Sequence, residues 1–505
     1  MNISVNNSDI ILWIGEKVLA EKNSSEIEKM GINRISKNIN ENIEFYNKLF
    51  NVENNFDLLY RTFFIGDRLA CIYFIDGFTK DDTLERVMEF FYNLKPEQVP
   101  DNGHDMSKMR IPYGETDLLK EEKQIVKNLL SGVVIMFVDG YDIAFGIDCR
   151  QYPSRSVSEP EKNKSMRGSR DGFVETLVFN TALIRRRIRD VDLNIEMLEV
   201  GTTSKTDVAL CYMGKRVDSN LLKDIRNKIN NIQVDSLTMN QESIAECLYK
   251  RVWINPFPKF KYVERPDATA AALLEGNIVI LVDNSPSAMI IPASVFDIIE
   301  EADDYYFPPI TGTYLRLSRF IINICALLVT PTWLLMVNHH RYMPEWLAFT
   351  LPKDVINIPL IFQFLILELA IDGLRLAALN TPSMLSTPLS VIAALVIGDF
   401  AVGSGWFNSE AMLYMAFVAL ANYTQPSFEL GYALKFMRII ILIFTSMFGI
   451  YGYVGGMIFT VLSIVMNKTL AGKSYIYPLI PFNFKNLLKR FFRFSINAVS
   501  ENKKS

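Results

Sequence analysis

The hydrophobic pattern of the chain changes after about residue 310. Before that point, short apolar runs alternate with segments of helical periodicity and with ordinary charge, which predicts α/β or α+β subdomains. From Phe320 to Pro481, long apolar stretches follow one another, and most charges lie between them. The clearest stretch, Phe320–Asn338, contains no charged residue and is long enough to cross a bilayer core of about 30 Å. The pattern therefore predicts a water-exposed region followed by an all-α membrane domain that crosses the bilayer several times.

One pattern occurs twice in the first region. Leu129–Gly132 precedes the apolar run VVIMFV and then Asp139, while Leu273–Gly276 precedes NIVILV and then Asp283. Because another apolar run follows each aspartate, each copy predicts a helix end, a strand, a tight turn and a second strand. A looser third copy at Ala70–Phe78 is typical of any buried hairpin. The two matched copies favour duplication of a subdomain.

Composition adds limits to this picture. The net charge of -4 over 505 residues favours neither a nucleic-acid binder nor an acidic tail. The first residues lack the pattern of a signal peptide, so the first region is expected in the cytoplasm. The five cysteines are scattered, which predicts neither a disulfide framework nor a zinc site. We expect no catalytic residues, no cofactor and no bound metal.

These observations predict an order of parts along the chain. A helical extension comes first, and two related cytoplasmic subdomains follow it. A membrane domain of roughly four to six crossings comes next, and a basic tail ends the chain. The expected bounds are 1–55, 56–190, 191–312, 313–482 and 483–505.

Charged residues inside apolar sequence are candidates for function, because an ionised group at mid-bilayer is costly and normally faces protein or water. Glu368, Asp372 and Arg375 have i, i+4 and i+7 spacing, which places them on one helix face. They line a polar path, or they form a structural ion-pair network. Asp399 interrupts the run VIAALVIGDFAVGSG and is the more isolated charge, which favours the polar path for this residue.

Small residues suggest how the membrane helices pack. Gly452 and Gly456 have the spacing of a close contact between helices. They also fit a turn between two shorter segments, because Met437–Met466 is too long for one ordinary crossing. The pattern leaves both interpretations open.

Flanking charge predicts the orientation, since Lys and Arg are enriched in cytoplasmic loops. Basic residues precede the first span, precede the long apolar segment and follow the last one. His339 would then lie outside. The tail FNFKNLLKRFFRFSINAV mixes aromatic and basic residues, and fits either the membrane surface or a plain cytoplasmic tail. The flanking residues are Arg316, Arg319, Lys435, Arg438, Lys485, Lys489, Arg490 and Arg493.

Several strings of the chain resemble one known family. They are YPSRSVSEPEKNKSMRGSRDGFVETLVFNTALIRRRIRD, VGTTSKTDVALCYM, NPFPKFKYVERPDATAAALLEGNIVILVDNSPS and TPSMLSTPLSVIAALVIGDFAVGSG. From about Phe56 to Phe482, the chain is similar to the A subunit of GerA-type spore germinant receptors. The strings GSRDGF, IRRRIRD, SKTD and FQFLILELAIDGLRLAALNTPS resemble most the branch called stage V sporulation protein AF. Leu376 and Asn380 depart from the acidic residue and arginine of receptor subunits, which argues against a direct part in a nutrient receptor.

The resemblance implies a protein of the inner membrane of bacterial endospores that acts in germination. It further implies oligomerisation around an ion-conducting path, release of monovalent cations, and contact with other germination proteins of the spore membrane. The N-terminal region and the tail would face the spore core. A secondary transporter and a non-conducting scaffold subunit are the alternatives, and a membrane-anchored enzyme is the least favoured class, because no catalytic motif occurs in residues 1–310. The ion, the stoichiometry and the gating signal do not follow from the sequence.

Overall fold

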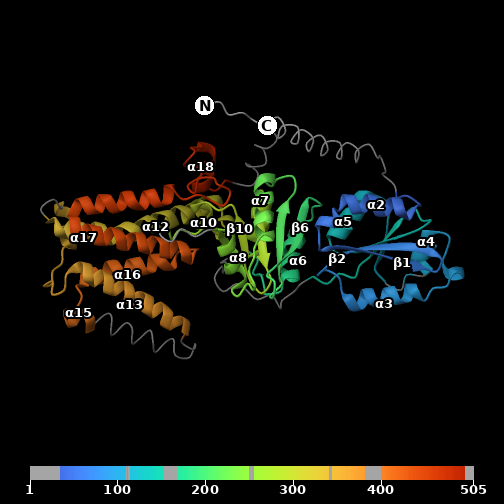
Figure 1. Cartoon of the computed structure of the whole chain (residues 1–505), viewed down its shortest axis with the longest axis horizontal. Helices are drawn as coiled ribbons and strands as arrows, with labels where there is room; N and C mark the ends of the chain where they lie inside the picture. Colours follow the sequence, from blue (N-terminus) through green and yellow to red (C-terminus); the bar gives the residue numbers. More distant parts are fainter. Residues whose placement is uncertain are drawn as a thin grey trace. The chain divides into compact units, whose positions relative to one another are not determined.

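The computed structural model describes residues 35–109, 111, 114–152, 168–249, 255–340, 344–380 and 400–494. The chain forms two compact units (Figure 1). The first unit comprises residues 1–156 and 178–197, and the second comprises residues 157–177 and 198–505. Each unit is described by itself.

The first unit contains a five-stranded antiparallel sheet with the strand order β1-β2-β4-β5-β3. The helices α2 and α5 lie over one face of this sheet, and α3 lies over the other (Figure 1). Apolar side chains of α4 belong to the same core as those of α3. The strand β4 is buried along its whole length, as expected of a strand covered on both faces. The elements are α2 (Ile39–Leu49), η1 (Val52–Asn54), β1 (Leu58–Ile65), β2 (Arg68–Ile75), α3 (Asp81–Tyr92), η2 (Pro96–Gln98), α4 (Gly103–Met109), β3 (Thr116–Leu119), α5 (Glu122–Leu130), β4 (Val134–Val138), β5 (Ala144–Ile147) and α6 (Leu177–Arg187).

A second five-stranded sheet has the equivalent order β6-β7-β9-β10-β8. Both sheets thus follow the same path of two strands, helices, a strand, a helix and two strands. The fold class predicted from the sequence is confirmed, including the two related subdomains, while their exact bounds stay predictions. The elements are β6 (Leu193–Val200), β7 (Thr206–Met213), α7 (Ser219–Asn230), α8 (Asn240–Leu248), β8 (Lys261–Val263), α9 (Pro266–Leu274), β9 (Ile278–Val282), β10 (Ala288–Ile291), α10 (Val295–Ile299) and α11 (Asp303–Tyr306).

The repeated sequence pattern forms the same structure in both copies. It covers the end of α5 with β4 and β5, and the end of α9 with β9 and β10. Its aspartate accepts a hydrogen bond from the first backbone N–H of a helix distant in the sequence. Asp139 accepts a hydrogen bond from the backbone N–H of Ile39, the first residue of α2, and Asp283 accepts one from Leu177, the first residue of α6. The looser copy, Ala70–Phe78, covers the larger part of β2 and leads into α3, so it is not a third copy of this motif.

Arg185 of α6 lies in the interior of the first unit. Its guanidinium forms two hydrogen bonds with the carboxylate of Asp57, at 2.7 and 2.9 Å, and one with the carbonyl of Leu193. Both charged side chains are almost completely buried. Arg185 is one of three consecutive arginines at the end of α6, and it forms a buried ion pair inside the unit.

The remainder of the second unit is helical. Within the described residues, α12 and α17 are long and apolar enough to cross a membrane. Trp333, near the end of α12, packs against Phe364 of α13 and Tyr414 of α16, so these helices share a core. The elements are α12 (Pro309–Asn338), η4 (Glu345–Thr350), α13 (Leu360–Asn380), α15 (Ala401–Gly403), α16 (Ser409–Tyr423), α17 (Phe428–Val465) and α18 (Phe484–Phe491).

The helix α17 is a hairpin of two helical segments. Gly449 has non-helical backbone angles, φ 57° and ψ -131°, and the chain turns back there. Gly456 then packs so closely on the first segment that an added Cβ would lie 3.0 Å from the Cα of Ile441, and Gly452 approaches the carbonyl of Phe444. The turn therefore lies at Gly449, and Gly452 and Gly456 lie against the first segment just after it.

Candidate functional site

A cluster of buried charges joins α13 to α17. Glu368 of α13 accepts a hydrogen bond from Nε of Arg438 in α17 at 2.7 Å, and Nη2 of the same arginine lies 2.6 Å from the same carboxylate oxygen. Lys435 of α17 lies 3.4 Å from the second oxygen of Glu368 and forms a short ion pair with Asp372. Glu368, Lys435 and Arg438 are 3%, 6% and 0% exposed, respectively. Arg438 also donates to the carbonyl of Ala326 in α12 at 2.8 Å, so three helices meet at this cluster.

The cluster balances its charges, with two carboxylates and two cations. Burying one unpaired charge would cost several kcal/mol, and that cost falls when oppositely charged groups are buried together with good geometry. The partners lie 67 and 70 residues from Glu368, so helical spacing could not predict them. The sequence placed Lys435 and Arg438 among flanking cytoplasmic charges. The structure places both inside the helical core instead.

The third member of the predicted trio has a different environment. The guanidinium of Arg375 lies over the rings of Tyr423, Phe428 and Tyr432, at 5.2, 5.8 and 5.4 Å from their centroids. Its Nε is buried and has no hydrogen-bond partner in the described part of the chain. Glu368 and Asp372 both lie beside Lys435, whereas Arg375 makes cation–π contacts. Asp399 lies outside the described residues.

A second charged network lies where α12 leaves the second sheet domain. Asp304 is fully buried and accepts hydrogen bonds from Arg316 at 3.3 Å and from Arg319 at 3.1 Å. Arg316 also pairs with Glu300 at 2.7 Å, and Arg490 of α18 lies 3.0 Å from the same carboxylate. We name these five residues the base network. Two arginines predicted as free flanking charges therefore join α12 to the domain before it.

Electrostatics at Glu300 agree with this arrangement. Burial alone would raise the pKa of its carboxyl group, because burial disfavours the charged form. The nearby cations Arg316, Lys261 and Arg490 outweigh burial and hold the pKa below its ordinary value. Glu300 is therefore a stable anion at the centre of the base network.

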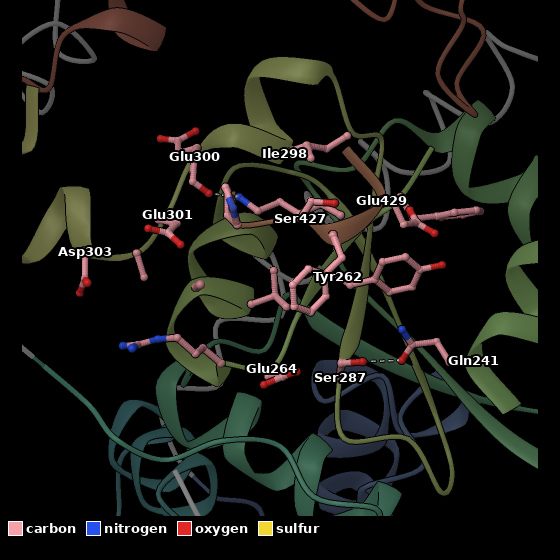
Figure 2. Close-up of a pocket in the computed structure, with 18 of the residues that line it drawn as sticks. Gln241, Tyr262, Glu264, Ser287, Ile298, Glu300, Glu301, Asp303, Ser427 and Glu429 are labelled. Carbon is pink, nitrogen blue, oxygen red and sulfur yellow. Dashed lines mark hydrogen bonds between the residues drawn. The ribbon is translucent and has the colours of Figure 1, made fainter. Parts of the chain in front are cut away.

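A cavity of about 200 Å³ lies beside the base network (Figure 2). Residues Pro426 to Glu429, at the start of α17, close one part of it, and side chains of the second sheet domain line the rest. Gln241 accepts a hydrogen bond from Ser287 at 2.9 Å in its wall. Carboxylates outnumber cations in the lining, which favours positively charged species. The charged lining residues are Glu242, Glu264, Glu300, Glu301, Asp303 and Glu429 against Lys261 and Arg265.

Lys259 forms another link, between the sheet domain and the segment that follows α17. Its amine donates to the carbonyl of Lys468 at 2.6 Å and to the side chain of Asn467, just after the hairpin. The rings of Tyr249 and Tyr475 lie 4.6 and 5.8 Å from it. Burial lowers the pKa of Lys259 from 10.5 to about 8, because the loss of water disfavours its charged form.

This lowered pKa predicts a pH dependence. A buried amine that is harder to protonate than in the unfolded chain disfavours folding while it is charged. That penalty is complete below about pH 8 and disappears as the pH rises from about 8 to 10.5. Relative to Lys259→Met, the free energy of unfolding of the wild type should therefore rise by up to about 3 kcal/mol across this window. Denaturation in mild detergent measures it, and parallel pH curves for the two proteins would contradict the assignment.

Comparison with known proteins identifies the chain. The family model described as Bacillus/Clostridium GerA spore germination protein matches residues 46–505. The chain belongs to the GerA family. This confirms the resemblance seen in the sequence.

Individual relatives of this GerA protein agree with the predicted branch. Stage V sporulation protein AF of Bacillus subtilis (strain 168) is 37% identical, and the match covers 90% of this chain and 92% of the relative. Spore germination protein KA of the same organism is 28% identical, covering 88% and 82%. Among solved structures, the N-terminal domain of the A subunit of the Bacillus megaterium spore germinant receptor GerK3 is 25% identical, with a TM-score of 0.39, covering 51% of this chain and 95% of that one.

Within the described part of this GerA protein, no group of three or more His, Cys, Asp or Glu side chains could hold a metal ion. Its charged side chains instead connect helices to one another and to the second sheet domain. The buried cluster ties α13 to α17, and the base network ties α12 to the second sheet domain. Sequence reasoning missed Lys435, Arg438 and Asp304 as members of these sites. A signal for the first two was available, since both interrupt apolar sequence as Glu368 does.

Proposed function

We propose that this GerA protein is a membrane subunit of spore germination that promotes the release of monovalent cations. It acts in an oligomeric complex of the inner spore membrane, with the N-terminal region and the tail on the cytoplasmic side. The charge-balanced cluster of Glu368, Asp372, Lys435 and Arg438 is the observation that carries the proposal. Membrane helices that only anchor a domain have no need of four charges, whereas an ion path needs polar groups among apolar helices.

The proposal assigns a role to each charged site. In the structure every member of the cluster has an opposite charge beside it, which suits a closed state that holds α13 against α17. Opening would separate these pairs and let the carboxylates face a path. The base network transmits changes in the sheet domain to α12, and the acidic cavity at the start of α17 concentrates cations at the cytoplasmic end.

Helix surfaces support assembly with neighbours in the membrane. Leu369 and Leu379 of α13 are 74% and 78% exposed, and Tyr451 of α17 is 85% exposed. Lipid tails or other copies of the chain would cover such side chains. A non-conducting scaffold subunit would use the same surfaces and the same ion pairs. Flux measurements therefore decide between a conducting subunit and a scaffold.

Asp399 provides a test of the polar path. Asp399→Asn preserves size but removes the charge, so the variant should reach the membrane at wild-type abundance and carry less potassium, or carry it with altered selectivity. Purified wild type and variant are reconstituted in liposomes, and potassium efflux is compared at equal protein content. Glu345→Gln, in the η4 segment outside the long apolar helices, is the matched control and should retain wild-type flux. Unchanged flux in Asp399→Asn would remove this residue from the path.

A further inference from the structure

The C-terminal helix α18 has two different faces. Its inner face joins the base network, where Arg490 lies 2.5 Å from Asp297 and Arg316 donates to the carbonyls of Lys489 and Arg490 at 2.9 and 3.2 Å. Those two carbonyls lie at the end of a helix, where backbone acceptors lack helical partners and carry partial negative charge. The arginine of α12 therefore fixes the end of α18.

Aromatic packing locates α18 along α12. The ring of Phe491 lies 5.0 Å from that of Phe320 and 5.9 Å from that of Phe296. Phe320 is the first residue of the uncharged apolar stretch. The helix α18 thus lies at the level where α12 changes from polar to apolar sequence, which is the level of a membrane surface if α12 spans the bilayer.

The outer side of this segment is apolar and basic. Lys485 and Lys489 are exposed and form no ion pair within the described residues. Residues 479–494 contain four basic residues and no acidic residue. Six large apolar side chains around the lysines are 44% to 67% exposed. They are Leu479, Ile480, Phe482, Phe484, Phe492 and Phe494.

We propose that the outer face of α18 and its flanking residues binds the surface of anionic phospholipids. Rings insert at the boundary between headgroups and acyl chains, while lysines attract the negative headgroups. A protein partner would need an acidic and apolar surface of matching shape, whereas a bilayer is already adjacent to α12. Because the inner face holds Glu300 and Arg316, α18 links the lipid surface to the base network.

This inference rests on the membrane placement in the proposed function, but not on ion flux. The test uses the full-length protein with Cys247→Ser and Cys325→Ser, since the other cysteines are buried. A fluorescent label is attached at Phe484→Cys, and the protein is reconstituted with spin-labelled lipids that quench at headgroup depth. Vesicles of phosphatidylcholine alone are compared with vesicles that also contain phosphatidylglycerol. Phe482→Cys provides a second position in case the first disturbs folding.

Quenching at position 484 should be strong only with phosphatidylglycerol and should weaken at raised salt. Lys485→Gln with Lys489→Gln should reduce it several-fold. A label at Lys223→Cys, on the exposed face of α7, should show little quenching. A label at Phe444→Cys, in α17, should be quenched by lipids that carry the spin label in their tails. Quenching of the label at Phe444→Cys, without quenching at Phe484→Cys or Phe482→Cys, would overturn lipid binding by α18. It would leave the membrane placement of α17 intact. Equal quenching in both kinds of vesicle would exclude a requirement for the anionic headgroup. A label that is shielded from water but not quenched by lipid would indicate a protein partner.

Discussion

Glu368→Gln should sharply reduce the amount of folded protein in the membrane. The substitution removes the only carboxylate that pairs with Arg438 among the described residues and leaves this arginine fully buried with an uncompensated charge. Breaking a buried pair in this way costs about 3–5 kcal/mol, which is a large part of the stability of a typical domain. Arg438→Gln should have a similar effect. Abundance in isolated membranes and thermal unfolding in mild detergent measure both.

The double variant separates a specific pair from general damage. Glu368→Gln with Arg438→Gln leaves two neutral groups that can hydrogen-bond, and it keeps Lys435 beside Asp372. Abundance should therefore recover to a level above either single variant. Arg375→Gln is the matched control, because Arg375 contacts aromatic rings and should not rescue Glu368→Gln. Rescue by Arg375→Gln, or no rescue by Arg438→Gln, would contradict the pairing.

Asp304→Asn should loosen the connection between the second sheet domain and α12. Asp304 is fully buried and accepts hydrogen bonds from both Arg316 and Arg319, so the neutral amide leaves positive charge in excess. We expect a loss of about 3 kcal/mol or more in local stability. Limited proteolysis of the full-length protein should show faster cleavage between residues 300 and 309.

The neighbouring residue supplies the control for this prediction. Asp303 is only partly buried, so Asp303→Asn should change stability by less than about 0.5 kcal/mol. Equal cleavage rates in Asp303→Asn and Asp304→Asn would contradict a special role for the buried aspartate. Partial recovery of Asp304→Asn by Arg319→Met would support it, because one of the two excess cations is removed.

Local chemistry in the sequence predicts the repeated unit well. The repeated pattern predicts a helix end, two strands and their turn because each step depends on neighbouring residues. The role of the aspartate in that turn could not be predicted, since Asp139 caps a helix 100 residues away. Likewise, the spacing of Gly452 and Gly456 fits a contact or a turn, and it does not indicate that the chain turns at Gly449.

The charged sites show the same limit. Helical spacing places Glu368 and Asp372 on one face, because that depends on the geometry of a single helix. Their partners come from another helix, and flanking charge suggested a different role for them. Arg316 and Arg319 look like cytoplasmic flanks for the same reason. Whether a basic residue near an apolar segment faces water or a buried carboxylate depends on tertiary packing, which local sequence does not encode.

Potassium efflux from liposomes separates a conducting subunit from a non-conducting scaffold. Purified wild-type protein is reconstituted into potassium-loaded vesicles, and efflux is followed beside protein-free vesicles and vesicles that contain Asp399→Asn. Vesicles with the wild type should lose potassium faster than protein-free vesicles, and those with Asp399→Asn should show a lower flux or an altered ion selectivity. If vesicles with the wild type lose potassium no faster than protein-free vesicles, the result would contradict a conducting subunit and favour the scaffold.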